Sequence, residues 1–210
     1  PRVPLVVDGK AGGNLHRLHI NGLHLSMSGI AKVNADGFVA NATSLPSLRA
    51  DMTVDALASN LSFITPLLPK GVTTNINIPR GIGLRGHVRL DGKRVATKFS
   101  ASQGGGSIGG TLALDMKRMA YDANIKSRRL PIAHFLKHQP VHPFTGSITA
   151  HGHGTDFFSP STNLHATVDI KALGYGKYNL DGINLKASLN GGHLVANADC
   201  RNKALKGKIG

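Results

Sequence analysis

Large aromatic side chains and charges are scarce in this sequence. It has no tryptophan, only 5% aromatic residues and 17% charged residues, whereas 40% of its residues are hydrophobic. A chain this apolar and this weakly charged is not intrinsically disordered. A compact globular core usually draws on more large rings, so their scarcity favours an extended sheet in which each strand buries one thin face. Glycine is abundant instead, with 26 among the 210 residues.

Cysteine pairs, long apolar runs and a leader are also missing. Cys200 is the single cysteine, which excludes an internal disulfide. No run approaches the roughly 20 apolar residues of a membrane-spanning helix. The first residues, from Pro1 onward, do not read as a signal peptide. We therefore expect both ends of the chain to be cut points in a longer protein, with any membrane anchor outside these residues.

The dominant pattern is alternation of apolar and polar residues, which is typical of half-buried strands. It runs through residues 84–90, 112–116, 164–170 and 183–189, and through a pair of segments at 16–20 and 23–27. Between such segments stand dipeptides that tolerate positive φ: Asn21-Gly22, Asp36-Gly37, Asp91-Gly92, Asp181-Gly182 and Asn190-Gly191. The sequence therefore predicts an all-β fold, an elongated antiparallel meander of hairpins.

Two segments, residues 57–68 and 130–137, break this alternation and predict short helical plugs. Pro66 would end the first, and Pro131 suits the first turn of the second. Each follows a strand and precedes a proline-containing loop and a glycine-marked strand. We interpret this recurring order as an internal repeat, with approximate units 1–50, 51–120 and 121–210 of one longer β-repeat domain that stack on one another.

The formal charge of +14 has several possible meanings. Lysine and arginine are spread along strands and turns, and the densest groups are residues 126–129 and 203–208. Neither is interleaved with aromatic residues, as in proteins that bind single-stranded nucleic acid. We expect mainly solvated strand faces, with attraction to anionic lipid headgroups as the second reading, and no nucleic-acid partner.

Motifs for catalysis, cofactors or metals are weak. Residues 104–109 match a dinucleotide fingerprint, but a strand rather than a helix is expected after them, so a hairpin with a bulge is the better interpretation. The pairs His151/His153 and His134/His138 each offer two zinc ligands where a site needs three or four, although Asp156 is near. We expect no enzyme, no catalytic residue, no cofactor and no metal.

A family resemblance rests on residues 178–189 with 191–194, on 146–154 followed by 156–160, and on the segment 130–136. These stretches resemble the TamB/AsmA-like family, the translocation and assembly module inner-membrane component, in its Bacteroidetes-type form. The resemblance implies a long periplasmic protein of Gram-negative bacteria, anchored in the inner membrane. It also implies a curved, U-shaped sheet, the β-taco, with an apolar groove. The implied roles are phospholipid transport between the inner and outer membranes and outer-membrane protein assembly with a TamA-like barrel, which would bind parts outside this chain.

A sheet with an uncovered apolar face must close, pack on another layer or bind something apolar. Burial of an acyl chain gains about 0.8 kcal/mol per methylene. We expect the groove to be lined by Leu84, Val88, Leu90, Leu112, Leu114, Ile148, Leu164, Val168, Ile170, Ile183, Leu185 and Leu189. The alternative is a closed sandwich core, as in a β-rich secreted adhesin or a carbohydrate-binding repeat.

Overall fold

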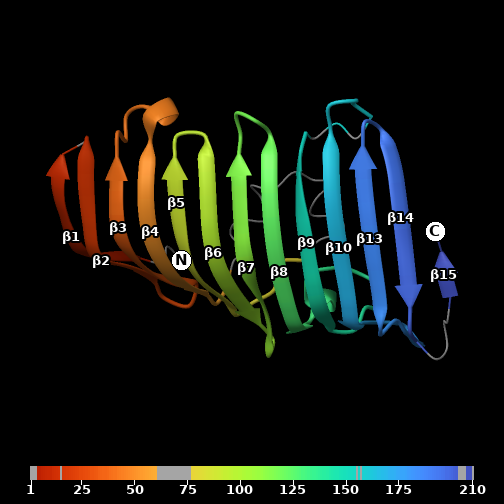
Figure 1. Ribbon diagram of the computed structural model, residues 1–210. Helices are drawn as coiled ribbons and strands as arrows, with labels where there is room; N and C mark the ends of the chain where they lie inside the picture. Colours follow the sequence, from red (N-terminus) through yellow and green to blue (C-terminus); the bar gives the residue numbers. More distant parts are fainter. Residues whose placement is uncertain are drawn as a thin grey trace.

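A computed structural model describes residues 4–14, 16–60, 77–154, 156, 158–202 and 207–209. These residues form one antiparallel sheet of 13 strands in the order β1-β2-β3-β4-β5-β6-β7-β8-β9-β10-β13-β14-β15 (Figure 1). The sheet does not close, because β1 and β15 lie at opposite ends of it. The predicted all-β antiparallel meander is confirmed.

The strands are uniform in length, mostly ten or eleven residues. Their bounds are β1 Leu5–Asn14, β2 Arg17–Met27, β3 Ala31–Ala40, β4 Arg49–Ala58, β5 Ile82–Asp91, β6 Arg94–Gln103, β7 Gly106–Asp115, β8 Ala120–Leu130, β9 Phe144–His153, β10 Asn163–Ala172, β13 Ile183–Asn190, β14 His193–Cys200 and β15 Gly207–Ile209. A small two-stranded sheet, β11 Gly174–Tyr175 and β12 Tyr178–Asn179, is inserted between β10 and β13.

The predicted turns are confirmed at three dipeptides and wrong at two. Asp91-Gly92, Asp181-Gly182 and Asn190-Gly191 stand where strands are joined. Asn21-Gly22 instead lies inside β2, and Asp36-Gly37 lies inside β3. The residues that tolerate positive φ in a turn also suit a β-bulge. Asn21-Gly22 forms such a bulge, and Asp36-Gly37 lies opposite it in β3.

The bulge in β2 is stabilised from β3. Asn21 and Gly22 together face the single residue Asp36, because the register shifts between Ile20 and Leu23. The extra residue leaves the Gly22 N–H outside the ladder, and it donates instead to the Asp36 carboxylate at 2.6 Å. The aspartate of the presumed turn is therefore a side-chain acceptor for a bulge in the neighbouring strand.

The two predicted helices have different outcomes. Leu57 and Ala58 belong to the end of β4, and residues 61–68 lie outside the described residues. The helix over 130–137 is wrong in extent: Leu130 ends β8, and only Ile132–His134 form a single 3-10 turn, η3, after Pro131. Eight residues are too few for a stable helix without extensive packing.

A packed interior is almost absent from the described part of the chain. The buried hydrophobic residues there are Ala35, at 7% exposure, and Leu189, at 4%. A single sheet leaves each face with one layer of side chains, and burial comes only from neighbours on that face. Among the described residues no helix has the length and hydrophobicity needed to cross a membrane.

Candidate functional site

One face of the sheet is apolar over its whole width. Residues paired across an antiparallel ladder point to the same face, so the register defines rows of neighbours. A row from β2 to β14 reads Leu23, Ala35, Val54, Gly86, Phe99, Gly110, Ile125, Ile148, Val168, Leu185 and Ala198. We call the face that carries this row the apolar face.

The structure places all twelve predicted groove residues on the apolar face. They belong to β5, β7, β9, β10 and β13, and the register keeps them in phase with one another. Several remain accessible: Leu84 is 42% exposed, Leu185 39% and Leu114 36%. Leu189, by contrast, is buried, at 4% exposure. The face therefore presents a partly exposed aliphatic surface, and the role of the twelve residues as a groove lining stays a prediction.

Glycines interrupt the aliphatic surface at defined points. Phe99 in β6 pairs with Gly86 of β5 on one side and with Gly110 of β7 on the other. A glycine opposite an aromatic residue leaves room for the ring above the backbone. The apolar face is therefore uneven around Phe99, where a ring stands between two positions without a side chain.

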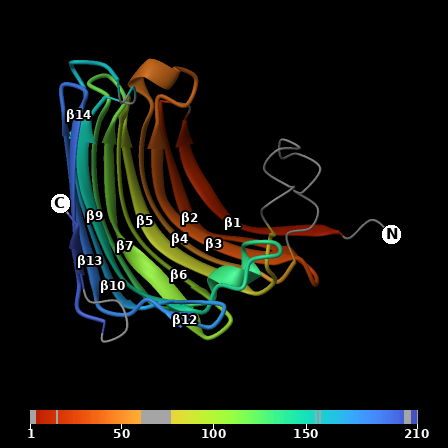
Figure 2. The ribbon, with the colours of Figure 1, turned by 90° about the vertical axis from the view of Figure 1, so that its right-hand side faces the viewer.

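One end of the apolar face is covered by the segment between β8 and β9 (Figure 2). His134 of this segment bonds through Nδ1 to the Gln103 side-chain oxygen at 2.9 Å, and the Gln103 amide donates to the Arg80 carbonyl at 3.2 Å. Ser127 donates to the Phe144 carbonyl at 3.1 Å. Gln103 and Ser127 are both buried, so the polar groups on this face have partners where water is excluded.

The opposite face, here the polar face, carries the charged residues. Its row next to the one above reads Asn34, Asp55, Arg85, Ser100, Gly109, Lys126, Ser147, Asp169, Asn184 and Asp199. Ion pairs link directly opposed residues of β4 and β5, with Arg85 2.6 Å from Asp55 and Arg89 2.9 Å from Asp51. The carboxylates of β4 on the polar face are therefore paired with cations of β5.

Asp51 of the polar face accepts hydrogen bonds from two side chains of the neighbouring strand. His87 and Arg89 of β5 both bond to it. The hydrogen bond from His87, followed by that from Arg89, lowers the pKa of Asp51 below its usual range. This arrangement resembles a structural cross-strand cluster, because all three groups stand on regular strands and are open to solvent.

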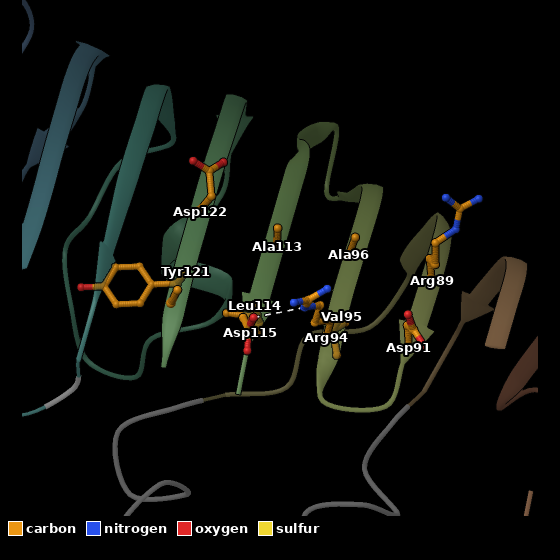
Figure 3. Close-up of a pocket in the computed structure, with 11 residues that line it drawn as sticks. Arg89, Asp91, Arg94, Val95, Ala96, Ala113, Leu114, Asp115, Tyr121 and Asp122 are labelled. Atoms are coloured by element: carbon orange, nitrogen blue, oxygen red, sulfur yellow. Dashed lines mark hydrogen bonds and ion pairs between the residues drawn. The ribbon is translucent and has the colours of Figure 1, made fainter. Parts of the chain in front are cut away.

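A depression of about 440 Å³ lies over β5–β8 (Figure 3). Ala96 and Ala113 of the polar face form its small side chains, and Arg89 and Asp122 stand at opposite sides of it (Figure 3). The apolar lining comes from these alanines and from residues near the strand ends. It is a shallow gap between longer side chains, without converging polar groups that would mark a reaction centre.

The histidine pairs singled out in the sequence are not brought together as ligand sets. The His151 ring stacks on His165 of β10, with centroids 5.1 Å apart, and His165 bonds to Ser188 at 3.1 Å. His134 bonds to Gln103. Across the described residues, no group of three or more histidine, cysteine or acidic side chains is placed to hold a metal ion. Gly104-Gly105 form the turn of the β6–β7 hairpin, as the hairpin interpretation predicts.

Comparisons with known proteins give no assignment. No protein-family model matches the sequence, and no curated protein and no solved structure matches it significantly.

Proposed function

We propose that this chain is a segment of a periplasm-spanning bridge protein of the TamB/AsmA-like type, whose apolar face forms a groove for phospholipid. The observation that carries the proposal is the apolar face itself, which extends through all the long strands and has no second layer over most of its width among the described residues. Monomeric proteins rarely leave so large a contiguous apolar surface in water.

The shape of the sheet supports a groove. In Figure 2 the strands bend along their length toward the side that carries the segment between β8 and β9, which is the apolar side. Neighbouring strands are about 4.8 Å apart, so 13 strands extend over roughly 60 Å. One acyl chain spans about 15 Å, half of the hydrocarbon core of a bilayer. Several chains in series would fit along such a face.

An acyl chain suits this surface chemically. Its methylenes need no directional bonds, and each one that leaves water gains about 0.8 kcal/mol. Valine, isoleucine, leucine and alanine offer no polar group that would fix a lipid at one position. A ligand held in this way can slide from row to row, as transport along a bridge requires.

A filled core, as in an adhesin or a carbohydrate-binding repeat, is less well supported. Such a core needs an opposing layer that buries the aliphatic row, and the described residues contribute only the 3-10 turns η1 (Leu45–Ser47) and η3 and the small β11–β12 sheet beside the single large sheet. Carbohydrate sites also use aromatic platforms, and the exposed tyrosines Tyr175 and Tyr178 stand together only in that small insertion.

The wider setting comes from the family resemblance. We place the working protein in the periplasm of a Gram-negative bacterium, held at the inner membrane, with the groove leading toward the outer membrane. Assembly of outer-membrane proteins with a TamA-like barrel is the second role that the resemblance implies, and it would use other parts of the protein. No enzymatic step and no cofactor are proposed.

The test is lipid retention by matched variants of the purified chain. Solvent extraction followed by mass spectrometry should detect phospholipid bound to the wild-type chain. Leu112→Asp, on the apolar face, should remove most of it, because a carboxylate in the path of an acyl chain must be desolvated. Thr111→Asp, one residue earlier on the polar face, should retain lipid as the wild type does.

A second matched pair of variants, in β13, tests whether lipid retention depends on the apolar face in general and not on position 112 alone. Ile183→Arg should lose lipid, whereas Asn184→Arg should keep it, since these neighbours in β13 stand on opposite faces. Circular dichroism must show that all four variants keep their strand content. Absence of lipid from the wild type, together with cooperative unfolding of both apolar-face variants, would mean a closed core.

A further inference from the structure

Three connections at one end of the sheet border an open cavity of about 580 Å³. They are the loop 41–48 between β3 and β4, which contains the 3-10 turn η1 (Leu45–Ser47), the β5–β6 turn at Gly92-Lys93, and the β7–β8 turn at residues 116–119. All three lie at the upper end of the sheet in Figure 1. The cavity is lined by Asn41, Pro46, Ser47, Arg49, Asp91, Gly92, Lys93, Arg94, Asp115, Lys117 and Arg118.

The lining of this cavity is strongly cationic. It has five basic side chains and two carboxylates, a formal charge of +3. Both carboxylates are already engaged: Asp91 pairs with Arg49 at 2.9 Å, and Asp115 with Arg94 at 3.2 Å. The remaining cations, Lys93, Lys117 and Arg118, have no carboxylate within ion-pair distance in the described part of the chain.

Backbone hydrogen bonds hold the three connections against one another. The Gly92 N–H donates to the Leu48 carbonyl at 2.8 Å, and the Met116 N–H donates to the Lys93 carbonyl at 2.9 Å. The Asp115 carboxylate accepts the N–H groups of Lys117 and Arg118, each at 3.0 Å. The turns that carry the free cations are therefore fixed before any ligand arrives, which reduces the entropy lost on binding.

A phosphate group matches this arrangement better than other ligands do. Three cations around one cavity suit a compact anion with several acceptor oxygens, and arginine adds paired N–H donors in a planar fork. The surplus of positive charge excludes metal cations. The end row of the apolar face, with Leu90, Val95 and Leu114, directly adjoins Asp91, Arg94 and Asp115 in sequence.

From this geometry we infer that the end of β4–β8 is a phosphate-binding site formed by Lys93, Lys117 and Arg118. The phosphate belongs either to a lipid headgroup, whose chains would have to pass over the strand ends to reach the end row of the apolar face on the other side of the sheet, or to free phosphate. The first source rests on the proposed function, whereas the anion site itself does not.

The test compares two triple variants of the whole chain that remove the same charge. Lys93→Gln/Lys117→Gln/Arg118→Gln changes the site, and Lys32→Gln/Lys126→Gln/Lys186→Gln changes three exposed lysines elsewhere on the polar face. Sedimentation with phosphatidylglycerol–phosphatidylcholine vesicles and titration with inorganic phosphate are the two arms. Pure phosphatidylcholine vesicles, which carry headgroup phosphates but no net charge, show how much of the binding depends on a net negative membrane surface.

A cation near an anionic lipid surface strengthens binding roughly fivefold, so the site variant should bind phosphatidylglycerol vesicles about 100-fold more weakly than the wild type. The control variant should lose much less, since its charges are dispersed beyond a Debye length of about 8 Å. If inorganic phosphate binds saturably in the wild type but not in the site variant, and vesicles show no such difference, free phosphate is the source.

Equal losses in the two triple variants, or no binding of either probe by the wild type, would overturn the site. Leu112→Asp separates this result from the proposed function. It should lose co-purified lipid yet keep the difference between the two triple variants when the same lysines and arginine are changed in its background.

Discussion

The two faces of this sheet are made by the same strands, yet their side chains differ in how far they find partners within the sheet. On the polar face, each carboxylate of β4 that pairs with β5 finds its cation directly across the ladder, as Asp55 does with Arg85 and Asp51 with Arg89. On the apolar face, residues such as Leu84 and Val88 from the same β5 meet only their neighbours in the same layer and remain exposed. The β4–β5 carboxylates of the polar face are thus paired within the sheet, whereas these aliphatic side chains of the apolar face are left partly exposed.

This contrast bears on how each face contributes free energy. Surface ion pairs contribute little to stability, about 0–1 kcal/mol each. Burial of the exposed aliphatic side chains on the apolar face would contribute more. Four changes can break or sharpen the contrast.

Gly37→Val should have the largest effect on stability. Gly37 has φ +144°, a conformation that side chains rarely adopt, and a Cβ there would lie 2.9 Å from the Met52 Cα. Strain and backbone displacement together should lower the free energy of unfolding by about 3 kcal/mol or more in urea denaturation. Gly12→Val is the control, because a Cβ there meets nothing within 4 Å; equal losses in both variants would contradict the assignment.

Removal of bound lipid should have the next largest effect on stability, and this effect should depend on the apolar face. A ligand present at 100 times its dissociation constant stabilises the folded state by about 2.7 kcal/mol. Delipidated chain should therefore melt earlier in calorimetry, and added phospholipid should restore the transition. The same treatment of Leu112→Asp should change nothing further, and an unchanged melting transition in the wild type would count against a lipid-filled groove.

Asp36→Ala tests the bulge that joins β2 to β3. Loss of the acceptor for the Gly22 N–H should cost about 1 kcal/mol in urea denaturation. Asp36→Asn keeps a side-chain oxygen at the same position and should recover most of the loss. If alanine and asparagine were equally stable, the hydrogen bond would not be what holds the bulge.

Asp51→Asn should have the smallest effect, and the loss of stability should be present at neutral pH and disappear in acid. His87 and Arg89 lower the pKa of Asp51 in the folded chain below the ordinary value of 3.8. Its contribution to stability is thus fully present above pH 3.8 and is lost as the pH falls through the lower, folded-state pKa. The asparagine variant should lack this acid-dependent part, measured by urea denaturation at several pH values, whereas Thr53→Ser on the same strand should retain it.

The sequence predicts the strands and their faces well, because a period of two is a direct consequence of strand geometry. The twelve aliphatic residues proposed for the groove fall on one face for that reason. The dipeptides Asn21-Gly22 and Asp36-Gly37 mislead, because local sequence specifies tolerance of positive φ but not whether a turn or a bulge uses it. The pairing of β2 with β3 determines that Asn21-Gly22 forms a bulge and not a turn.

The cationic cavity could not be read from the sequence. Its cations Lys93, Lys117 and Arg118 come from two separate turns, and Arg49 comes from a third connection. None forms a dense run, and the denser group at residues 126–129 lies largely along β8. Antiparallel register brings the three connections to one end, and backbone hydrogen bonds between the turns set their spacing.

The order of the strands has a consequence for how the chain folds. Except for the β11–β12 insertion, each strand of the sheet lies beside the strands that precede and follow it in sequence, so nearly every contact closes a short loop. Hairpins can therefore form early, at several places at once, and grow toward one another, and folding should be fast for a β protein of this size. Opening should begin at β1 and β15, which each have one neighbour. Amide hydrogen exchange should then be slowest in β5–β9 and become faster, strand by strand, toward both edges.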